Sequence, residues 1–172
     1  MSKIAIFGLA GTGTSTVGKL LSEKLGYKYL STGDIFFRKK AQELGITLAE
    51  LHERAKNDPA TDRECDEAVR KFGQENDNFV VESRLAWFFI PDSFKIKLTC
   101  DFDMRTKRLA ERDKLSFEDA KTHILEREKI DAERYRKFYG ISDLGPDEKF
   151  DIIVDSTNTP AAKIVEMILS KI

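Results

Sequence analysis

Apolar and polar positions divide this chain of 172 residues into short apolar segments separated by longer helical patterns. Several apolar segments are continuous runs of β-branched and aromatic residues, as is typical of strands buried on both faces of a sheet. We expect strands at Lys3–Phe7, Tyr27–Leu30, Phe79–Glu82, Phe94–Thr99 and Ile152–Asp155. We expect helices at about 14–25, 33–44, 47–56, 60–76, 102–113, 116–138 and 159–171. Five strands with interleaved helices predict an α/β fold with a five-stranded parallel sheet and right-handed crossovers.

Two of the predicted connections are longer than a simple crossover requires. One spans about residues 33–76 and contains three helical patterns, and the other spans about 113–140 with one long charged helix. Ligands of open α/β sheets bind at the carboxyl ends of the strands, where long insertions form substrate arms and lids. We therefore expect a single domain with a core of residues 1–32, 77–112 and 141–172, to which these insertions add an arm and a lid.

The composition is that of an ordinary globular protein, with 41% hydrophobic and 34% charged residues. A formal net charge of −1 provides no general attraction to nucleic acid or to an anionic membrane, so we expect neither as a partner. No apolar run reaches about 18 residues, and the apolar start of the chain is too short for a signal peptide. Cys65 and Cys100 lie far apart without metal-ligand spacing, so we expect free thiols and a cytoplasmic location.

A glycine-rich segment follows the first predicted strand and leads directly into a helix. Its residues are Gly8, Leu9, Ala10, Gly11, Thr12, Gly13, Thr14, Ser15 and Thr16. Gly8 and Gly13 have the spacing of a P-loop, whose backbone N–H groups cradle phosphate oxygens at a helix N-terminus. Ser15 stands where this motif places its Mg²⁺-binding hydroxyl. An ordinary βα turn does not need this density of glycines and hydroxyls, so the segment predicts a P-loop NTPase fold that binds phosphate.

One position departs from the P-loop pattern G-x-x-x-x-G-K-[ST]. Thr14 occupies the place of the lysine that contacts the β- and γ-phosphates. Lys19 is a poor substitute, because five helical positions turn its side chain to another face. Removing a charge-stabilising group of this kind lowers reaction rates by orders of magnitude.

Polar residues follow the second predicted strand and are suited to hold a second phosphate group. They are Thr32, Gly33, Asp34 and Arg38. An alternative interpretation is a helix N-cap, with Ser31 or Thr32 as the capping residue and Asp34 in the first turn. The two interpretations are compatible, because helix caps and anion sites use the same N–H donors.

The third predicted strand ends in a carboxylate that is followed closely by an arginine. Glu82 stands where P-loop enzymes hold Mg²⁺ or its water, and Arg84 is suited to grip an anionic substrate. The alternative is a structural ion pair between Glu82 and Arg84. Trp87, Phe88 and Phe89 come next, and we interpret most of this aromatic run as core rather than as a platform for a base.

Arginines recur at helical spacing after the fourth predicted strand. One set is Arg105, Arg108 and Arg112 at i, i+3 and i+7, and the other is Arg127, Asp131 and Arg134 at i, i+4 and i+7. Each set lies on one helix face. Charged helices are most often solvated faces, but beside a P-loop such a face is suited to surround a transferred phosphoryl group and to exclude water.

Together these motifs resemble those of the nucleoside monophosphate kinases, most closely the short cytidylate kinases of archaeal type and their bacterial relatives. The resemblance runs nearly from end to end, and many members of that group also lack the P-loop lysine. Three further segments are similar: Asp62-Arg-Glu-Cys-Asp66 in the acceptor arm, Glu126-Arg-Glu-x-x-Asp131-x-x-Arg134 in the lid, and Asp155-Ser-Thr-Asn158 near the ATP base. The resemblance implies transfer of the ATP γ-phosphate to CMP or dCMP with Mg²⁺, by a monomer.

The resemblance also implies roles for individual residues. Residues 8–16, with Arg108 and Arg112, bind ATP; Ser15 binds Mg²⁺ directly and Glu82 binds it through water. The acceptor nucleotide is held by Thr32, Gly33, Asp34, Arg38, Asp62, Asp66, Arg84 and Asp131. Arg127, Arg134 and Ser15 are the expected catalytic residues, and we expect Arg127 or Arg134 to move over the γ-phosphate and so to compensate for Thr14.

Two positions depart from the family pattern, and two other functions stay open. Ser83 stands where the family has glycine, and Phe37 stands where it has an arginine that here comes one residue later, at Arg38. The first alternative is a kinase for another small acceptor, such as AMP, UMP or a non-nucleotide. The second is a catalytically weak nucleotide-binding protein, with Thr14 as the lesion.

Overall fold

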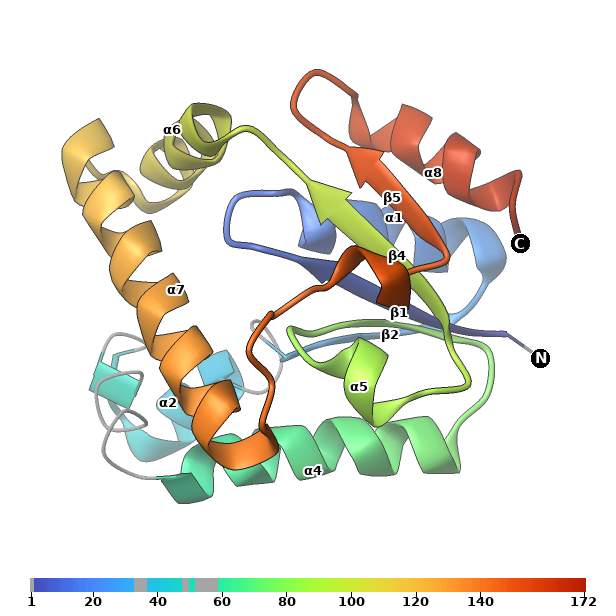
Figure 1. Cartoon of the computed structure of the whole chain (residues 1–172), viewed down its shortest axis with the longest axis horizontal. Helices are drawn as coiled ribbons and strands as arrows, with labels where there is room; N and C mark the ends of the chain where they lie inside the picture. Colours follow the sequence, from blue (N-terminus) through green and yellow to red (C-terminus); the bar gives the residue numbers. More distant parts are fainter. Residues whose placement is uncertain (1, 33–36, 48–49, 52–58) are drawn as a thin grey trace.

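The structure is a computed structural model that describes residues 2–32, 37–47, 50–51 and 59–172. Its centre is a five-stranded sheet (Figure 1). The strands are β1 (Lys3–Gly8), β2 (Lys28–Ser31), β3 (Phe79–Glu82), β4 (Phe94–Thr99) and β5 (Ile152–Asp155), in the order β2-β3-β1-β4-β5. All neighbouring strands are parallel. The predicted parallel sheet is therefore confirmed, and each strand lies within one residue of its predicted bounds.

Helices cover both faces of the sheet (Figure 1). Helices α1 (Thr14–Leu25) and α8 (Ala161–Leu169) pack on one face, where Ile4 and Ile6 of β1 are buried. Helices α4 (Pro59–Glu75) and α5 (Ala86–Phe89) pack on the other face, with Ala5 and Phe7 of β1. Successive side chains of a strand point to opposite faces, so a central strand between two helix layers is apolar at every position.

Helices α6 (Phe102–Asp113) and α7 (Phe117–Tyr139) form a hairpin outside the sheet. Ser116 caps α7 by accepting a hydrogen bond from the Asp119 N–H at 3.1 Å, and Leu109 and Ile124 are buried between the two helices. In Figure 1, α7 runs from α6 toward α4 along the side to which the strands point. The hairpin therefore stands over the carboxyl edge of the sheet, where ligands of such folds bind.

Some elements differ from the sequence-based expectation. Helix α2 (Arg38–Leu44) begins within the predicted helix 33–44, whose residues 33–36 lie outside the described part of the chain, as does most of the predicted helix 47–56. Helix α5 and the short 3₁₀ helix η2 (Asp147–Lys149) were not predicted. The aromatic run that forms α5 is apolar at nearly every position and so has no helical periodicity. No helix in the described ranges is long and apolar enough to cross a membrane.

Candidate active site

The loop between β1 and α1 has the backbone shape of a phosphate-binding loop. Gly11 and Gly13 have φ angles of 85° and 89°, which residues with side chains rarely adopt. A Cβ atom on Gly11 would lie 2.6 Å from the backbone oxygen of Arg105. Gly13 is the N-cap of α1 and has no side chain to occupy the first N–H groups of the helix. These N–H groups and the helix dipole are therefore suited to an anion.

Hydroxyl groups from two elements hold Glu82 at the mouth of this loop. Ser15 Oγ and Ser31 Oγ donate to Glu82 Oε1 at 3.0 Å and 3.2 Å, and the Tyr29 hydroxyl donates to Oε2 at 2.9 Å. The parallel register explains part of this arrangement, because Ser31 lies directly beside Glu82 on the neighbouring strand. Three donors fix the orientation of the carboxylate toward the start of α1.

Ser15 and Glu82 fit a Mg²⁺ ion that also binds nucleotide phosphates. Their oxygens are the hard ligands that Mg²⁺ prefers, and Mg²⁺ in such sites takes one or two protein ligands together with phosphates and water. Within the described ranges there is no group of three or more His, Cys, Asp or Glu residues that could hold a metal by itself.

Arg84 lies against the phosphate loop and not against Glu82. Its Nη1 donates to the carbonyl oxygen of Gly8, and its Nε lies 3.5 Å from Asp131 Oδ2 of α7. Only 16% of its side chain is exposed. Glu82 instead accepts hydrogen bonds from hydroxyl groups. The structure therefore does not form the alternative ion pair between Glu82 and Arg84.

Asp131 connects two of the expected arginines on the inner side of α7. It is 6% exposed, and its Oδ1 lies 3.1 Å from Arg134 Nη2 while its Oδ2 faces Arg84. Arg134 also donates to the Tyr135 hydroxyl at 2.6 Å and lies over the Tyr135 ring. Asp131 thus faces the arginine that contacts the phosphate loop, and it also pairs with Arg134.

Arg127 differs from its neighbours because its side chain is exposed. Surrounding protein partly desolvates the guanidinium and lowers its pKa, and the positive charge of Arg84 nearby lowers it further. An accessible cation next to other cations is suited to receive an added anion.

The three arginines of α6 have different partners. Arg105 is 5% exposed, donates to the carbonyl oxygen of Ala10 at 2.8 Å, and pairs with Glu128 of α7. It therefore joins the phosphate loop to both helices of the hairpin. Arg112 is exposed and pairs with the adjacent Asp113 at 2.7 Å.

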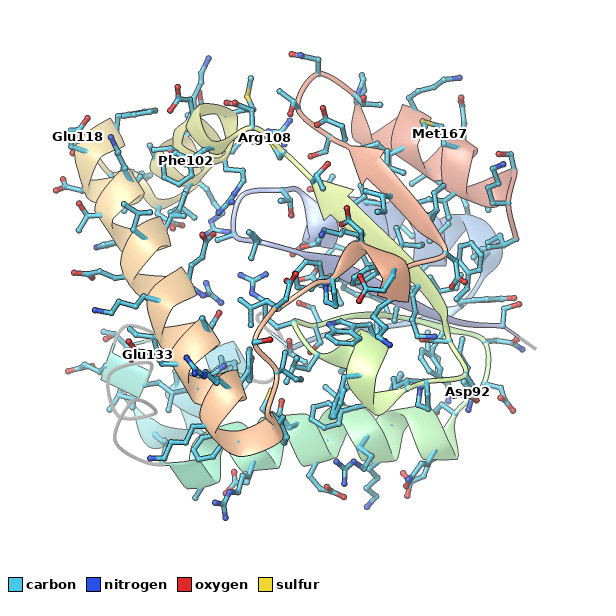
Figure 2. The ribbon with its side chains drawn as sticks, in the orientation of Figure 1. Asp92, Phe102, Arg108, Glu118, Glu133 and Met167 are labelled. Carbon is cyan, nitrogen blue, oxygen red and sulfur yellow. The ribbon has the colours of Figure 1, made fainter. Side chains whose placement is uncertain are left out.

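Arg108 bridges the phosphate loop and the loop after β5. It donates to the backbone oxygens of Ser156 at 2.7 Å and Thr157 at 3.2 Å, and more weakly to that of Gly11 at 3.4 Å. Figure 2 shows it where α6 meets the end of β4. Ser156 Oγ also donates to the Thr12 carbonyl oxygen at 2.8 Å, so two side chains join the predicted ATP-base loop at Asp155–Asn158 to the phosphate loop.

A second polar cluster lies where α7 meets α4. The Tyr139 hydroxyl donates to Asp66 Oδ2 at 2.5 Å, and Asp66 is 9% exposed. Burial raises the pKa of Asp66, despite the opposing effects of Tyr139 and of Arg134 and Arg70. Asp66 was expected from the sequence to contact the acceptor; Tyr139 was not.

Some predicted site residues lie outside what the structure describes. Gly33 and Asp34 are among the undescribed residues, and the side chains of Arg38 and Asp62 are not described although their backbones lie in α2 and α4. Thr32 is described, and its hydroxyl donates to the backbone oxygen of Glu82 at 3.3 Å. The roles assigned to all these residues stay predictions.

The aromatic run after β3 is mainly core, as the sequence indicated. Trp87 and Phe89 are each 8% exposed, and Trp87 Nε1 donates to the Leu144 carbonyl oxygen at 3.0 Å. Phe88 is 42% exposed.

A cavity of about 670 Å³ lies behind the phosphate loop, between β4, α7 and the segment 142–145. Its lining includes Leu9 and Thr12 of the phosphate loop together with Arg105, so the cavity adjoins this loop on the side away from Ser15 and Glu82.

The chain is similar in sequence to proteins of a known family. The model of the cytidylate kinase-like family matches residues 3–158. The chain belongs to the cytidylate kinase-like family. Among curated members, the cytidylate kinase of Ignicoccus hospitalis is 38% identical over 170 residues, covering 98% of this chain and 97% of that protein. The cytidylate kinase of Archaeoglobus fulgidus is 34% identical over 171 residues, covering 99% and 94% of the two chains.

Solved structures support the fold. An uncharacterised protein from Eubacterium ventriosum aligns with a TM-score of 0.71 and 22% identity, covering 99% of this chain and 97% of its own. Shikimate kinase from Acinetobacter baumannii aligns with a TM-score of 0.65 and 21% identity, covering 99% and 92%. These structures confirm the expected fold, and the family model and the curated relatives confirm the expected family.

Besides Tyr139, two features around the phosphate loop were not predicted from the sequence: the contact of Tyr29 with Glu82 and the burial of Arg105. Tyr29 contacts Glu82 from the middle of β2, where it reads as an ordinary strand residue. Arg105 has the same helical spacing as Arg108 and Arg112, but its near-complete burial depends on how α6 packs against the phosphate loop. The only sequence signal for Tyr29 was its position two residues before Ser31, near the carboxyl end of a strand adjacent to β3.

Proposed function

We propose that this protein is an ATP-dependent kinase that transfers the γ-phosphate of ATP to CMP or dCMP, giving ADP and CDP or dCDP. Membership of the cytidylate kinase-like family supports kinase activity, and the archaeal relatives named cytidylate kinase support the acceptor. Those relatives match over nearly the full length of both chains, so both insertions that surround the proposed site are included.

One observation carries this proposal: an uncapped helix N-terminus, a Ser15–Glu82 pair and the Arg84 guanidinium converge at the carboxyl edge of the sheet. The first binds phosphate, the second fits a phosphate-bound cation, and the third adds positive charge. A protein that only bound a nucleoside would not need these three features together.

On the donor side, the backbone N–H groups of residues 8–16 would hold the ATP phosphates. Mg²⁺, when bound by Ser15 directly and by Glu82 through water, would neutralise phosphate charge and orient the phosphates. Arg108 lies between the phosphate loop and the loop after β5, which suits a role beside the ATP base. Arg112, the second predicted donor-side arginine, lies further out on α6 and is exposed.

On the acceptor side, Arg38, Arg84 and Arg134 would bind the phosphate of the monophosphate. Asp131 contacts Arg84 and Arg134 and so is suited to orient both. Its second proposed role is a contact with the ribose of the acceptor. Asp66 lies in the same inter-helix region, where α7 meets the arm.

The reaction requires positioning and charge rather than a dedicated base. An oxygen of the monophosphate, already anionic, forms a bond to the γ-phosphorus as the bond to the β–γ bridging oxygen breaks, and ADP leaves with that electron pair. Arginines of α7 would neutralise charge on the transferred group, and closure of α7 would exclude water. Arg127 suits this role because it is accessible and already close to Arg84.

The test is to incubate the purified protein with Mg·ATP and each ribo- and deoxyribonucleoside monophosphate, and to measure ADP formation. We expect turnover with CMP and dCMP and little with AMP or GMP. Turnover confined to another acceptor would keep the kinase and refute the cytidylate assignment. Binding of Mg·ATP without turnover on any acceptor would refute the proposed activity.

We also propose a cytoplasmic monomer, and size-exclusion chromatography with light scattering would test the oligomeric state.

A further inference from the structure

The phosphate loop contains a tight turn at residues 9–12. The Thr12 N–H donates to the Leu9 carbonyl oxygen at 3.2 Å, which closes the turn. Gly11, the third residue of the turn, has a φ angle of 85°, as in a type II turn. Turns of type I and type II place their central peptide, here the one joining Ala10 to Gly11, in opposite orientations. Because glycine adopts positive and negative φ angles with similar ease, the turn alone does not fix which orientation is present.

Arg105 holds this central peptide in one orientation. Its Nε donates to the Ala10 carbonyl oxygen at 2.8 Å, so this oxygen points toward Arg105. The C=O and N–H groups of a trans peptide point in opposite directions, so the Gly11 N–H points away from Arg105. The Gly11 N–H donates to no other residue that the structure describes. It is therefore a backbone donor with a set direction.

This direction is that of the proposed phosphate site. Arg105 lines the cavity that adjoins the loop on the side away from Ser15 and Glu82. The Gly11 N–H, which points away from Arg105, therefore faces the side of the loop where the phosphates and Mg²⁺ of the proposed site would lie. In the opposite peptide orientation, the Ala10 carbonyl oxygen would face that side and would repel a phosphate group.

The Arg105 side chain is itself held in place from several sides. It is 5% exposed, pairs through Nη2 with Glu128 of α7, and lies 5.7 Å from the centre of the Phe102 ring (Figure 2). Asp101 caps the start of α6 by accepting a hydrogen bond from the Asp103 N–H at 2.9 Å. The planar guanidinium can hold two acceptors at once in a fixed geometry. The orientation of the loop peptide thus depends on a buried cation that other elements hold.

We propose that Arg105 is a positioning residue, which holds the Ala10–Gly11 peptide so that the Gly11 N–H points toward the phosphates of the donor nucleotide. This inference rests on the proposed phosphoryl transfer, in which the loop binds ATP. Thr14 brings no positive charge to these phosphates, so correctly oriented N–H groups carry more of their binding. Donors that are oriented before the substrate binds need no reorganisation during the reaction. Arg105 acts through the peptide and does not itself contact the nucleotide.

A comparison of Arg105→Met with Glu128→Gln tests this role. Methionine keeps much of the side-chain volume but cannot donate to Ala10, whereas Glu128→Gln leaves Arg105 in place with an amide oxygen as its partner. The readout is the affinity for Mg²⁺ with inorganic tripolyphosphate, which has no base or ribose, measured by calorimetry. We expect about tenfold weaker binding by Arg105→Met, and binding by Glu128→Gln within about twofold of wild type. Wild-type affinity in Arg105→Met, or equal losses in both variants, would overturn the proposal.

The orientation of the peptide can also be followed at the Gly11 amide by NMR of ¹⁵N-labelled protein. A hydrogen bond to a phosphate oxygen moves the signal of an amide proton downfield. On saturation with Mg²⁺ and tripolyphosphate, we expect this shift for Gly11 in wild type and in Glu128→Gln, and its loss in Arg105→Met. A Gly11 signal that does not move in wild type, or that moves equally in Arg105→Met, would contradict the proposed orientation.

A double variant protects the test against misfolding, because Arg105→Met leaves Glu128 without its cation. Arg105→Met combined with Glu128→Met replaces the ion pair by two apolar side chains, an exchange that proteins often tolerate. We expect the same weak tripolyphosphate binding and the same loss of the Gly11 shift. A folded double variant with wild-type affinity would overturn the proposal.

Kinetics separate this role from an effect on the acceptor. In Arg105→Met we expect kcat to fall about 10- to 100-fold while KM for CMP stays within about twofold of wild type. A raised KM for CMP with unchanged kcat would overturn the proposal. The binding and NMR readouts need no turnover, so the two proposals can fail separately. A wild-type protein that does not transfer phosphate would refute the function, while the Gly11 signal would still decide the role of Arg105.

Discussion

Removing the Tyr29 hydroxyl tests whether the orientation of Glu82 matters for the reaction. In the structure this hydroxyl donates to Glu82 Oε2 at 2.9 Å, and the two serine hydroxyls donate to Oε1. Tyr29→Phe deletes one oxygen and leaves the ring in its contact with Gly18. Glu82 then keeps the two serine hydrogen bonds to Oε1 and loses the tyrosine hydrogen bond to Oε2, so its orientation is less restricted.

The magnitude follows from the kind of bond that is lost. A hydrogen bond to a charged group contributes about 1.5–3 kcal/mol, and the partial exposure of Glu82 favours the lower end. We expect the free energy of unfolding to fall by about 1–2 kcal/mol. If rotation of Glu82 disturbs a Mg²⁺-bound water, the Mg²⁺ concentration that gives half-maximal velocity should rise about threefold to tenfold, with a smaller fall in kcat at saturating Mg²⁺.

The assay is initial velocity with CMP and ATP as Mg²⁺ is varied, beside urea unfolding of each variant. Tyr27→Phe is the matched control, because it removes the same hydroxyl two residues earlier, before β2 begins. It should leave the Mg²⁺ dependence at the wild-type level. A Tyr29→Phe variant with wild-type Mg²⁺ dependence would refute the positioning role, whatever its stability.

Three further predictions concern α7 and the arm. Arg127→Ala should lower kcat about 10²- to 10³-fold. Arg136→Ala should have little effect, because Arg136 is exposed and lies about two and a half turns further along α7, on the opposite face. Equal kcat values would contradict a catalytic role for Arg127. Glu128→Ala leaves the buried Arg105 cation without its carboxylate, so thermal or urea unfolding should show a loss of about 3 kcal/mol, and a loss below about 1 kcal/mol would argue against this link. Burial raises the folded-state pKa of Asp66 above the ordinary 3.8, so its stabilising protonation is complete below that value and is lost as pH rises through the raised pKa. Asp66→Asn should therefore gain stability relative to wild type between pH 4 and pH 7 in urea unfolding, and a pH-independent difference would contradict this.

The fold was predictable because its signals are local. Residues 3–7 and 79–82 are continuous apolar runs that end in polar or glycine residues, so their strands could be placed to within one residue. Helix α7 begins at a serine cap and ends before Gly140, both of which are visible in the sequence. Helix α5 gave no such signal, because its four residues are all apolar.

The site was only partly predictable, because contacts between strands depend on register. Glycine spacing indicates a phosphate loop, and a carboxylate after a buried strand indicates a cation site, since both motifs are contiguous in sequence. The contact of Arg84 with Gly8 follows from pairing of β1 with β3, which no spacing within either segment reveals. Arg105 and Arg108 have equivalent spacing, yet only packing against the loop buries the first.

The most direct test of the account follows the fate of the γ-phosphate on wild-type protein. ATP labelled at the γ-phosphorus is mixed with Mg²⁺ and CMP, and the labelled products are separated and quantified over time. We expect the label to appear in CDP, at a rate far above its release as inorganic phosphate, although Thr14 stands in place of the P-loop lysine. Label that stays in ATP, or that appears only as inorganic phosphate, would contradict it.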